Sequence, residues 1–172
     1  SRWFINEDWL LFFDVILYNR KLLNIWMIVK MKITPNQASY RPCFTAYEKT
    51  FVMLKPDAIN RHLDSKIMDE IKSSGLTVLT QWNGTPTRSK MEGNYITHKD
   101  KFFFKDWIDF LVSGKIKAMV LGGEDAVARA STLKKSIRSQ YAPGEKRFNL
   151  IHSSDDVESA KREIANFFDT EV

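Results

Sequence analysis

Apolar positions in this chain form two patterns, short continuous runs and runs with helical spacing, separated by polar or glycine-containing turns. Short runs rich in β-branched and aromatic residues predict strands, and apolar residues three or four positions apart predict helices. The expected strands are 50–54, 76–82, 116–121 and a short one before His152; the expected helices are 63–73, 90–98, 104–113, 125–135 and a last one ending near Phe168. This βαββαβ order is typical of an α+β, ferredoxin-like sandwich, in which a four-stranded antiparallel sheet carries helices on one face, with added helices here.

A histidine stands where the last strand meets the last helix. The segment Asn149-Leu-Ile-His152-Ser-Ser-Asp155 ends an apolar run, and Asp155 with Glu158 predicts a capping box at the helix start. The amino-terminal end of a helix attracts anions, and a neutral imidazole is a competent nucleophile. Taken alone, however, a single histidine at a strand end favours a packed or surface role.

A lysine occupies the corresponding place after the first strand. Lys55-Pro-Asp57 follows Thr50-Phe-Val-Met-Leu54 directly, so a cation is predicted on a stiff turn at the strand's carboxyl end, with the Asp57 side chain closing the turn. Considered alone, this triplet favours an ordinary solvated turn.

Together these segments are more specific. Lys55-Pro-Asp-Ala-Ile-Asn-Arg61, Asn149 to Asp155, and Val157-Glu-Ser-Ala-Lys-Arg-Glu163-Ile resemble, in order and spacing, the nucleoside diphosphate kinase family. The similarity runs from about Tyr47 to Phe168, well over half of the chain. It implies that His152 is the phosphorylated nucleophile and that Lys55 meets the transferred phosphate. Ser154 and Glu163 match residues that orient the histidine.

The resemblance also implies a nucleotide site. Asn149 would contact the sugar, Tyr95 matches a tyrosine near the histidine, and Phe103 matches the phenylalanine on which the base stacks. Phe102, Phe103 and Phe104 are also consistent with a core cluster, and one ring can serve the core while another faces the base.

The chain departs from the family between Gly123 and Asn149, where it is shorter. If Ser136-Ile-Arg138 matches the family's Thr-Ile-Arg, Arg138 contacts the phosphates; if Pro143 to Arg147 matches instead, Arg147 does. The first placement keeps the family's distance to His152 and is preferred. A second family arginine has no clean counterpart: Ser131 falls at its place and Arg129 lies two residues earlier. A family threonine also lacks a match.

The implied activity is transfer of a γ-phosphate from a nucleoside triphosphate to a nucleoside diphosphate in two half-reactions, with Mg²⁺ held mainly by the nucleotide. No Gly-x-x-x-x-Gly-Lys-Ser/Thr loop is present, which fits a histidine relay. The resemblance further implies a homo-oligomer and broad base specificity.

Two alternatives stay open. One is a catalytically weakened nucleotide-binding or scaffold domain. The other is an RNA-binding module, which needs exposed aromatic residues on its central strands, and the first strand offers only Phe51 for this purpose.

Composition fits one domain in a reducing compartment. The chain has 172 residues with 44% apolar content, one cysteine, three scattered histidines and a net charge of +5. These values predict a single core, no disulfide framework, no protein-held metal and a cytoplasmic location. Residues 1–45 contain six Lys and Arg against three Asp and Glu, so most of the positive excess lies outside the kinase-like region, and nucleic acid is not an expected partner.

The first 46 residues are predicted to lie outside the domain, which spans 47–172. Their apolar runs are interrupted by Asp14 and by Asn19-Arg-Lys21, so none approaches the ~20 residues needed to cross a bilayer. The acidic Glu7 and Asp8 argue against a signal peptide. Three interpretations remain for this segment: an amphipathic helix that packs on the domain or a partner, a membrane-surface segment, or residues foreign to the mature protein. Pro35 and Pro42 indicate a linker.

Overall fold

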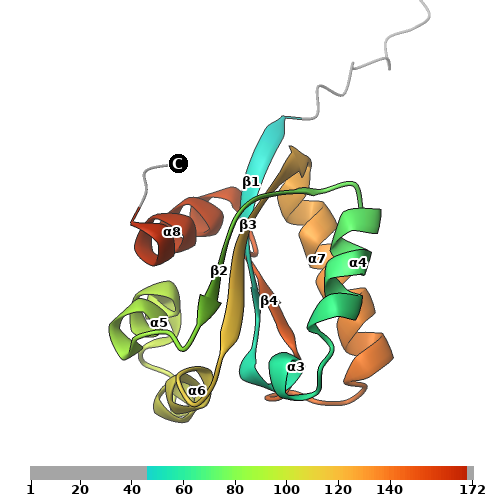
Figure 1. Cartoon of the computed structure of the whole chain (residues 1–172). Coiled ribbons are helices and arrows are strands. Elements are labelled where there is room, and N and C mark those ends of the chain that lie inside the picture. The colour runs from blue at the N-terminus through green and yellow to red at the C-terminus, as the bar shows by residue number, and fades with distance from the viewer. Residues whose placement is uncertain (1–45, 170–172) are drawn as a thin grey trace, which may run out of the picture. The chain divides into compact units, whose positions relative to one another are not determined.

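The computed structural model describes residues 46–169, and the expectations for the amino-terminal segment lie outside them. In chain order the elements are β1 (Tyr47–Leu54), α3 (Pro56–Asn60), α4 (Asp64–Ser73), β2 (Thr77–Gly84), α5 (Arg88–Asn94), the 3₁₀ helix η2 (Ile96–His98), α6 (Phe104–Leu111), β3 (Ile116–Glu124), α7 (Ala126–Tyr141), β4 (Ile151–Ser153) and α8 (Val157–Phe168). The strands form one antiparallel sheet in the order β2-β3-β1-β4. The predicted α+β, ferredoxin-like class is therefore confirmed (Figure 1).

Helices cover both faces of this sheet, so the expectation of helices on one face was wrong. Figure 1 shows α4 and α7 on one side and α5, α6 and α8 on the other. In β1, Val52 and Leu54 belong to the core under α4 and α7, while Phe51 and Met53 belong to the opposite core. A strand buried on both faces reads as a continuous apolar run, and the run 50–54 has that form. Because Phe51 is fully buried, it cannot act as the RNA-stacking aromatic considered above.

Two element boundaries alter the site. Helix α7 continues past Lys135 to Tyr141, so Arg138 lies on a helix and not in a loop. The residue before it, Ile137, is completely buried and packs this part of the helix on the sheet. A short helix, α3, also begins directly after Lys55, with Pro56 at its first position, where the missing N–H is not needed. Lys55 is therefore the N-cap residue of a helix and does not lie in an open turn.

The predicted capping box at Asp155 was wrong by one residue. Asp156 is the residue before α8, and its carboxylate accepts a hydrogen bond from the Ser159 backbone N–H at 2.7 Å. Asp155 instead pairs with Lys134, whose Nζ lies 3.0 Å from its Oδ1. The anion-attracting end of α8 is thus retained, and the Asp155 carboxylate is available to a residue of α7.

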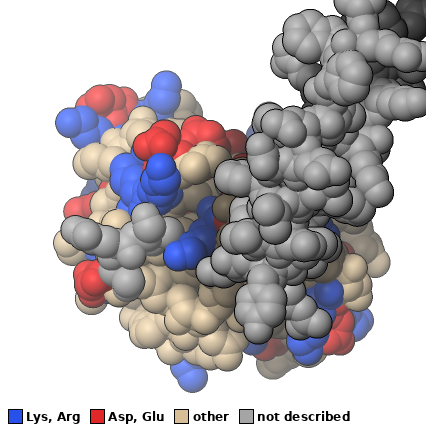
Figure 2. Space-filling view, turned by 90° about the horizontal axis from the view of Figure 1, so that it is seen from above, with Lys and Arg blue, Asp and Glu red and all other residues tan. Residues whose placement is uncertain are grey.

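Surface features add two observations. No helix in the described part of the chain is long and apolar enough to span a membrane. Seen from above, the uncovered part of the surface carries acidic side chains next to basic ones (Figure 2). The view therefore shows no continuous basic stripe of the kind that binds nucleic acid.

Candidate active site

His152, Ser154 and Glu163 meet at one carboxylate oxygen. His152 lies on β4, where it pairs with Met53 of β1, and Glu163 lies on α8. The imidazole Nε2 is 3.0 Å from Glu163 Oε2, and the Ser154 hydroxyl donates to the same oxygen at 2.7 Å. All three residues come from a single strand-to-helix passage, which explains how so short a segment assembles the group.

This contact selects one form of the imidazole. An ionised carboxylate only accepts hydrogen bonds, so in the neutral imidazole of His152 this contact favours the tautomer with the proton on Nε2 and the lone pair on Nδ1. Glu163 is nearly buried, and the Ser154 hydroxyl fixes its position. Nδ1 is therefore the nitrogen suited to attack an electrophile.

The Lys55 and Asn149 segments are tied together by three hydrogen bonds. The Lys55 N–H donates to the Leu150 carbonyl at 2.8 Å, and the Leu150 N–H donates to Asp57 Oδ2 at 2.9 Å. Lys55 Nζ donates to Asn149 Oδ1 at 2.7 Å. Leu150 has a φ of 68°, a left-handed conformation that a leucine rarely adopts, and these bonds hold it there. The two motifs that resemble the family in sequence are thus one structural unit.

The Lys55 ammonium is a perturbed cation. Its side chain is completely buried. Burial, followed by the positive charges of Arg138 and Lys134, lowers the pKa of Lys55 to about 7, although the Asp57 carboxylate opposes this shift. An arriving phosphate would supply the missing negative charge and restore the charged form of Lys55. Phosphate binding and protonation of Lys55 therefore favour each other.

Arg138 stands beside the histidine strand. Its Nη2 donates to the Ile151 carbonyl at 2.5 Å, immediately before His152. Within the described residues, its half-buried guanidinium forms no ion pair, because no carboxylate lies within salt-bridge distance of it. The remaining N–H groups are therefore available to a bound anion.

Several buried polar atoms of this region make no hydrogen bond with the described residues. They are Asp57 Oδ1, Tyr95 Oη, Trp107 Nε1 and Arg138 Nε. Buried groups of this kind are rare in folded proteins and often mark a place where water or a ligand completes the pairing. Burial raises the pKa of the Tyr95 hydroxyl, which therefore stays protonated and can donate.

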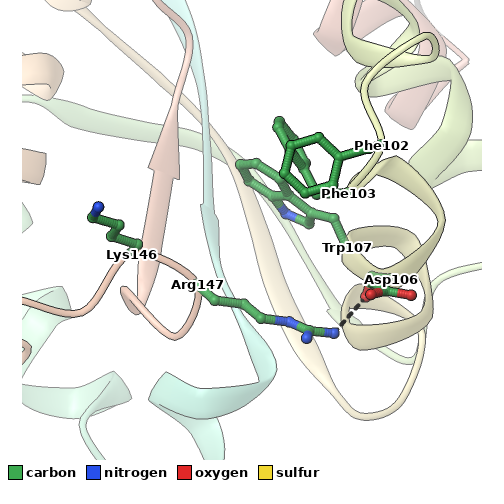
Figure 3. Close-up of a pocket in the computed structure, with 6 residues that line it drawn as sticks. All are labelled: Phe102, Phe103, Asp106, Trp107, Lys146 and Arg147. Carbon is green, nitrogen blue, oxygen red and sulfur yellow. Dashed lines mark hydrogen bonds between the residues drawn. The ribbon is translucent and has the colours of Figure 1, made fainter.

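Tyr95 connects the histidine to a separate cavity. Its ring lies 5.2 Å from that of His152 and 5.4 Å from that of Trp107, measured between centroids. Trp107 lines a cavity of about 450 Å³ with Phe102, Phe103, Asp106, Lys146 and Arg147. Figure 3 shows the three rings together, Lys146 apart from them, and Arg147 reaching to Asp106 of α6. This volume lies within the range of small-molecule sites, roughly 300–1,000 Å³.

A family model described as nucleoside diphosphate kinase matches residues 48–172. The chain belongs to this family. A nucleoside diphosphate kinase of Thiobacillus denitrificans is 40% identical over 133 residues, which cover 72% of this chain and 93% of that protein. One from Wolinella succinogenes is 40% identical over 131 residues, covering 70% and 95%.

Solved kinases of the family show the same fold. The Aquifex aeolicus enzyme has a TM-score of 0.64 and 32% identity, covering 70% of this chain and 94% of that one. The Halobacterium salinarum enzyme, solved in complex with CDP, has a TM-score of 0.64 and 35% identity, covering 73% and 90%. As a nucleoside diphosphate kinase, this chain is an enzyme that transfers phosphate between nucleotides.

The structure places the predicted site residues of this kinase in two adjoining groups. Glu163 and Tyr95 contact His152, Ser154 bonds Glu163, and Arg138 bonds the carbonyl just before the histidine. Lys55 and Asn149 bond to each other, whereas Phe103 and Arg147 line the cavity. Arg129, considered as a match for the second family arginine, instead donates to the carbonyls of Ser74 and Glu124, next to the end of α4.

Sequence reasoning missed two residues. Lys134 lies one helical turn before Arg138, and its Nζ donates to the Ser153 carbonyl at 3.2 Å as well as pairing with Asp155. Only a helix that continues to Tyr141 places Lys134 and Arg138 on the same side, so the i, i+4 spacing was the available signal. Trp107, whose ring centroid is 4.9 Å from Lys55 Nζ, had no sequence signal of its own.

Proposed function

We propose that this enzyme transfers phosphate through a phosphohistidine at His152 Nδ1. In the first half-reaction the Nδ1 lone pair attacks the γ-phosphorus of a nucleoside triphosphate. An N–P bond forms, the bond from phosphorus to the bridging oxygen breaks, and the electron pair leaves with the diphosphate. In the second half-reaction, an oxygen of another nucleoside diphosphate attacks the phosphorus and the N–P bond breaks.

The contact between His152 Nε2 and Glu163 carries this proposal. It leaves Nδ1 unprotonated and holds the ring in one orientation, and it places a negative charge where the imidazole becomes cationic on phosphorylation. Ser154 supports the same oxygen, so Glu163 does not need to move during the cycle. Glu163 and Ser154 act as positioning residues.

Three cations are proposed to neutralise the transferred phosphate. Lys55 would contact the phosphoryl oxygens, Arg138 would contact the phosphates from α7, and Lys134 would provide the charge that the missing family arginine no longer supplies. Electrostatic stabilisation dominates phosphoryl transfer, since little covalent work is left to the protein. The same cations weigh against the alternative of a weakened nucleotide-binding or scaffold domain.

The nucleotide is proposed to extend from the histidine into the cavity. Asn149, held by Lys55 and by its own bond to the Lys146 carbonyl at 2.7 Å, would contact the sugar. Tyr95 would donate to the phosphate or sugar between the two groups, and Phe103 would support the base. The Halobacterium enzyme was solved with CDP, a nucleoside diphosphate, and the acceptor proposed here is of that class.

Mg²⁺ is proposed to arrive with the nucleotide. In the described part of the chain, no three His, Cys, Asp or Glu side chains gather to hold a metal ion. An ion that is bound mainly by phosphate oxygens needs no such group of protein ligands, and this is the usual state of Mg²⁺ in phosphoryl-transfer enzymes. When bound, Mg²⁺ would help neutralise the phosphate charge.

We also propose a cytoplasmic homo-oligomer whose catalytic domain spans 47–172. The strand order leaves β2 at an edge of the sheet, and its Leu79 and Trp82 are exposed, which suits pairing with a second copy. The 1–46 segment is proposed to be dispensable for catalysis.

Labelling with γ-labelled ATP tests the central step of the proposed reaction, phosphorylation of His152. A phosphoenzyme that requires His152 supports this step, and efficient transfer without His152 overturns it.

A further inference from the structure

We infer that Trp107 is a positioning residue for Lys55: the face of its indole ring holds the buried Lys55 ammonium in place and favours its charged form before a nucleotide arrives. Trp107 thus acts on the phosphate site through Lys55. The inference rests on the proposed function, because Lys55 is the proposed phosphate contact.

In the described part of the chain, the Lys55 ammonium is held by uncharged groups. Its Nζ donates to Asn149 Oδ1 at 2.7 Å and lies 4.9 Å from the centroid of the Trp107 ring. No carboxylate of residues 46–169 lies within salt-bridge distance of this nitrogen. The Lys55 side chain is completely buried, so neighbouring groups must replace the water that an exposed ammonium would bind.

An aromatic face suits a cation that must later bind phosphate. The π electrons of an indole ring attract an ammonium group, and this attraction is stronger when the pair is removed from water. A carboxylate in the same place would also stabilise the cation, but its negative charge would compete with the phosphate. The Trp107 ring carries no net charge, so it stabilises Lys55 and leaves the positive charge for the nucleotide.

The Trp107 ring is itself held in place by other rings. Its centroid lies 5.4 Å from that of Tyr95 and 5.6 Å from that of Phe103. The His98 ring stacks on it at 6.3 Å, with 10° between the two planes. The next residue, Ile108, is buried in the core and anchors this turn of α6. A ring packed in this way has little freedom to turn its face away from the ammonium.

The charged groups around Lys55 make a favourable ring contact consequential. Burial, Arg138 and Lys134 of α7 lower the pKa of Lys55, whereas Asp57 of α3 raises it. If the Trp107 ring also favours the cation, weakening its π electrons lowers this pKa further. If Trp107 only excludes water, weakening its π electrons leaves the pKa unchanged, and removing the ring raises it. The two roles therefore predict different results.

Fluorinated tryptophans at position 107 test this inference, because fluorine withdraws π-electron density with little change in ring shape. The pKa is measured without nucleotide from the ¹³C shift of the Lys55 Cε, assigned by its absence in Lys55→Met. The Lys55 pKa should fall from about 7 with each added fluorine, by about one pH unit in total, the scale of one buried cation–π contact. The same series at Trp82 is the control, since no cation lies over the Trp82 ring within the described residues.

ADP affinity gives the functional result. At about pH 8, a Lys55 pKa that is lower by one pH unit should weaken ADP binding about tenfold. A Lys55 pKa that stays constant or rises along the Trp107 series would overturn the inference, and so would an equal fall along the Trp82 series. A falling pKa with unchanged ADP affinity would support the action of Trp107 on Lys55 and contradict the proposed phosphate contact of Lys55.

Discussion

Glu163 Oε2 lies 3.0 Å from Nε2 of His152 and also accepts the Ser154 hydroxyl at 2.7 Å, so one buried oxygen holds both the proposed nucleophile and its neighbour. This arrangement makes the histidine's orientation and tautomer depend on a single carboxylate. The consequences of changing that carboxylate are therefore specific.

Glu163→Gln should lower kcat by roughly 10- to 100-fold with little change in KM, because the amide keeps the shape but cannot stabilise the cationic imidazole. Steady-state kinetics with ATP and a diphosphate acceptor measure both constants. Glu158→Gln is the matched control on the same helix, since Glu158 is exposed and, among residues 46–169, its carboxylate forms an ion pair with Lys161 alone. A parallel rise in KM, or an equal loss in the control, would contradict the positioning role.

Arg138→Ala should lose about 1.5–3 kcal/mol of transition-state stabilisation with ATP as donor, the scale of a charged hydrogen bond, and Arg147→Ala should lose much less. The reason is position: Arg138 bonds the carbonyl of Ile151 beside His152, whereas Arg147 reaches across the cavity to Asp106. The measurement is kcat/KM for each variant. The reverse ranking would move the phosphate contact to Arg147.

Nucleotide affinity should weaken as pH rises from about 7 to about 9, where the nucleotide phosphates no longer titrate. Burial lowers the pKa of Lys55 to about 7, so the charged, anion-binding form is lost from the free enzyme as pH passes that value. Calorimetric titration with ADP should show the dissociation constant rising with pH by up to about tenfold per unit.

Lys55→Met provides the control for this pH dependence. Its affinity should be weaker than that of the wild type at about pH 7 and nearly constant to about pH 9, because the titrating group is gone. A wild-type affinity that does not change with pH, or a variant that keeps the full dependence, would show that another group is responsible.

Part of this site could be predicted from the sequence. The family resemblance suggested that Ser154 and Glu163 orient His152, and the predicted strand-to-helix passage is short enough to bring the three residues together. Lys55 and Asn149 needed a tertiary contact between β1 and the segment before β4. Only the family resemblance suggested that contact, because hydrophobic periodicity does not report pairing between distant strands.

Other features depended on information that local patterns do not contain. The α7 prediction ended at Lys135, although no breaker occurs before Pro143 and Gly144. The shortened end hid the fact that Lys134 and Arg138 lie one turn apart on the same helix. Asp155 and Asp156 offer the same capping chemistry, so the path of the chain leaving β4 decides between them. The cavity joins Trp107 to Lys146, which are distant in sequence and meet only in the folded chain.

Removing residues 1–45 should leave kcat/KM per folded domain nearly unchanged, because every site residue lies between Lys55 and Glu163. This truncation keeps Ala46, whose carbonyl accepts from the Asp125 N–H at 3.4 Å. Solubility should improve, because the segment carries Trp3, Trp9 and Trp26. Kinetics, thermal melting and size-exclusion chromatography with light scattering measure these effects. A lower melting temperature or an altered oligomer would show that the segment supports the domain.

The most direct test of the central claim is the covalent state of His152. Incubation with γ-labelled ATP should give a phosphoprotein that is labile to acid, stable to base and discharged by GDP or dTDP, as expected of a phosphorylated imidazole. His152→Ala should fold with a near-normal melting temperature and neither acquire label nor transfer phosphate. Labelling that survives acid, or substantial transfer by His152→Ala, would contradict the account.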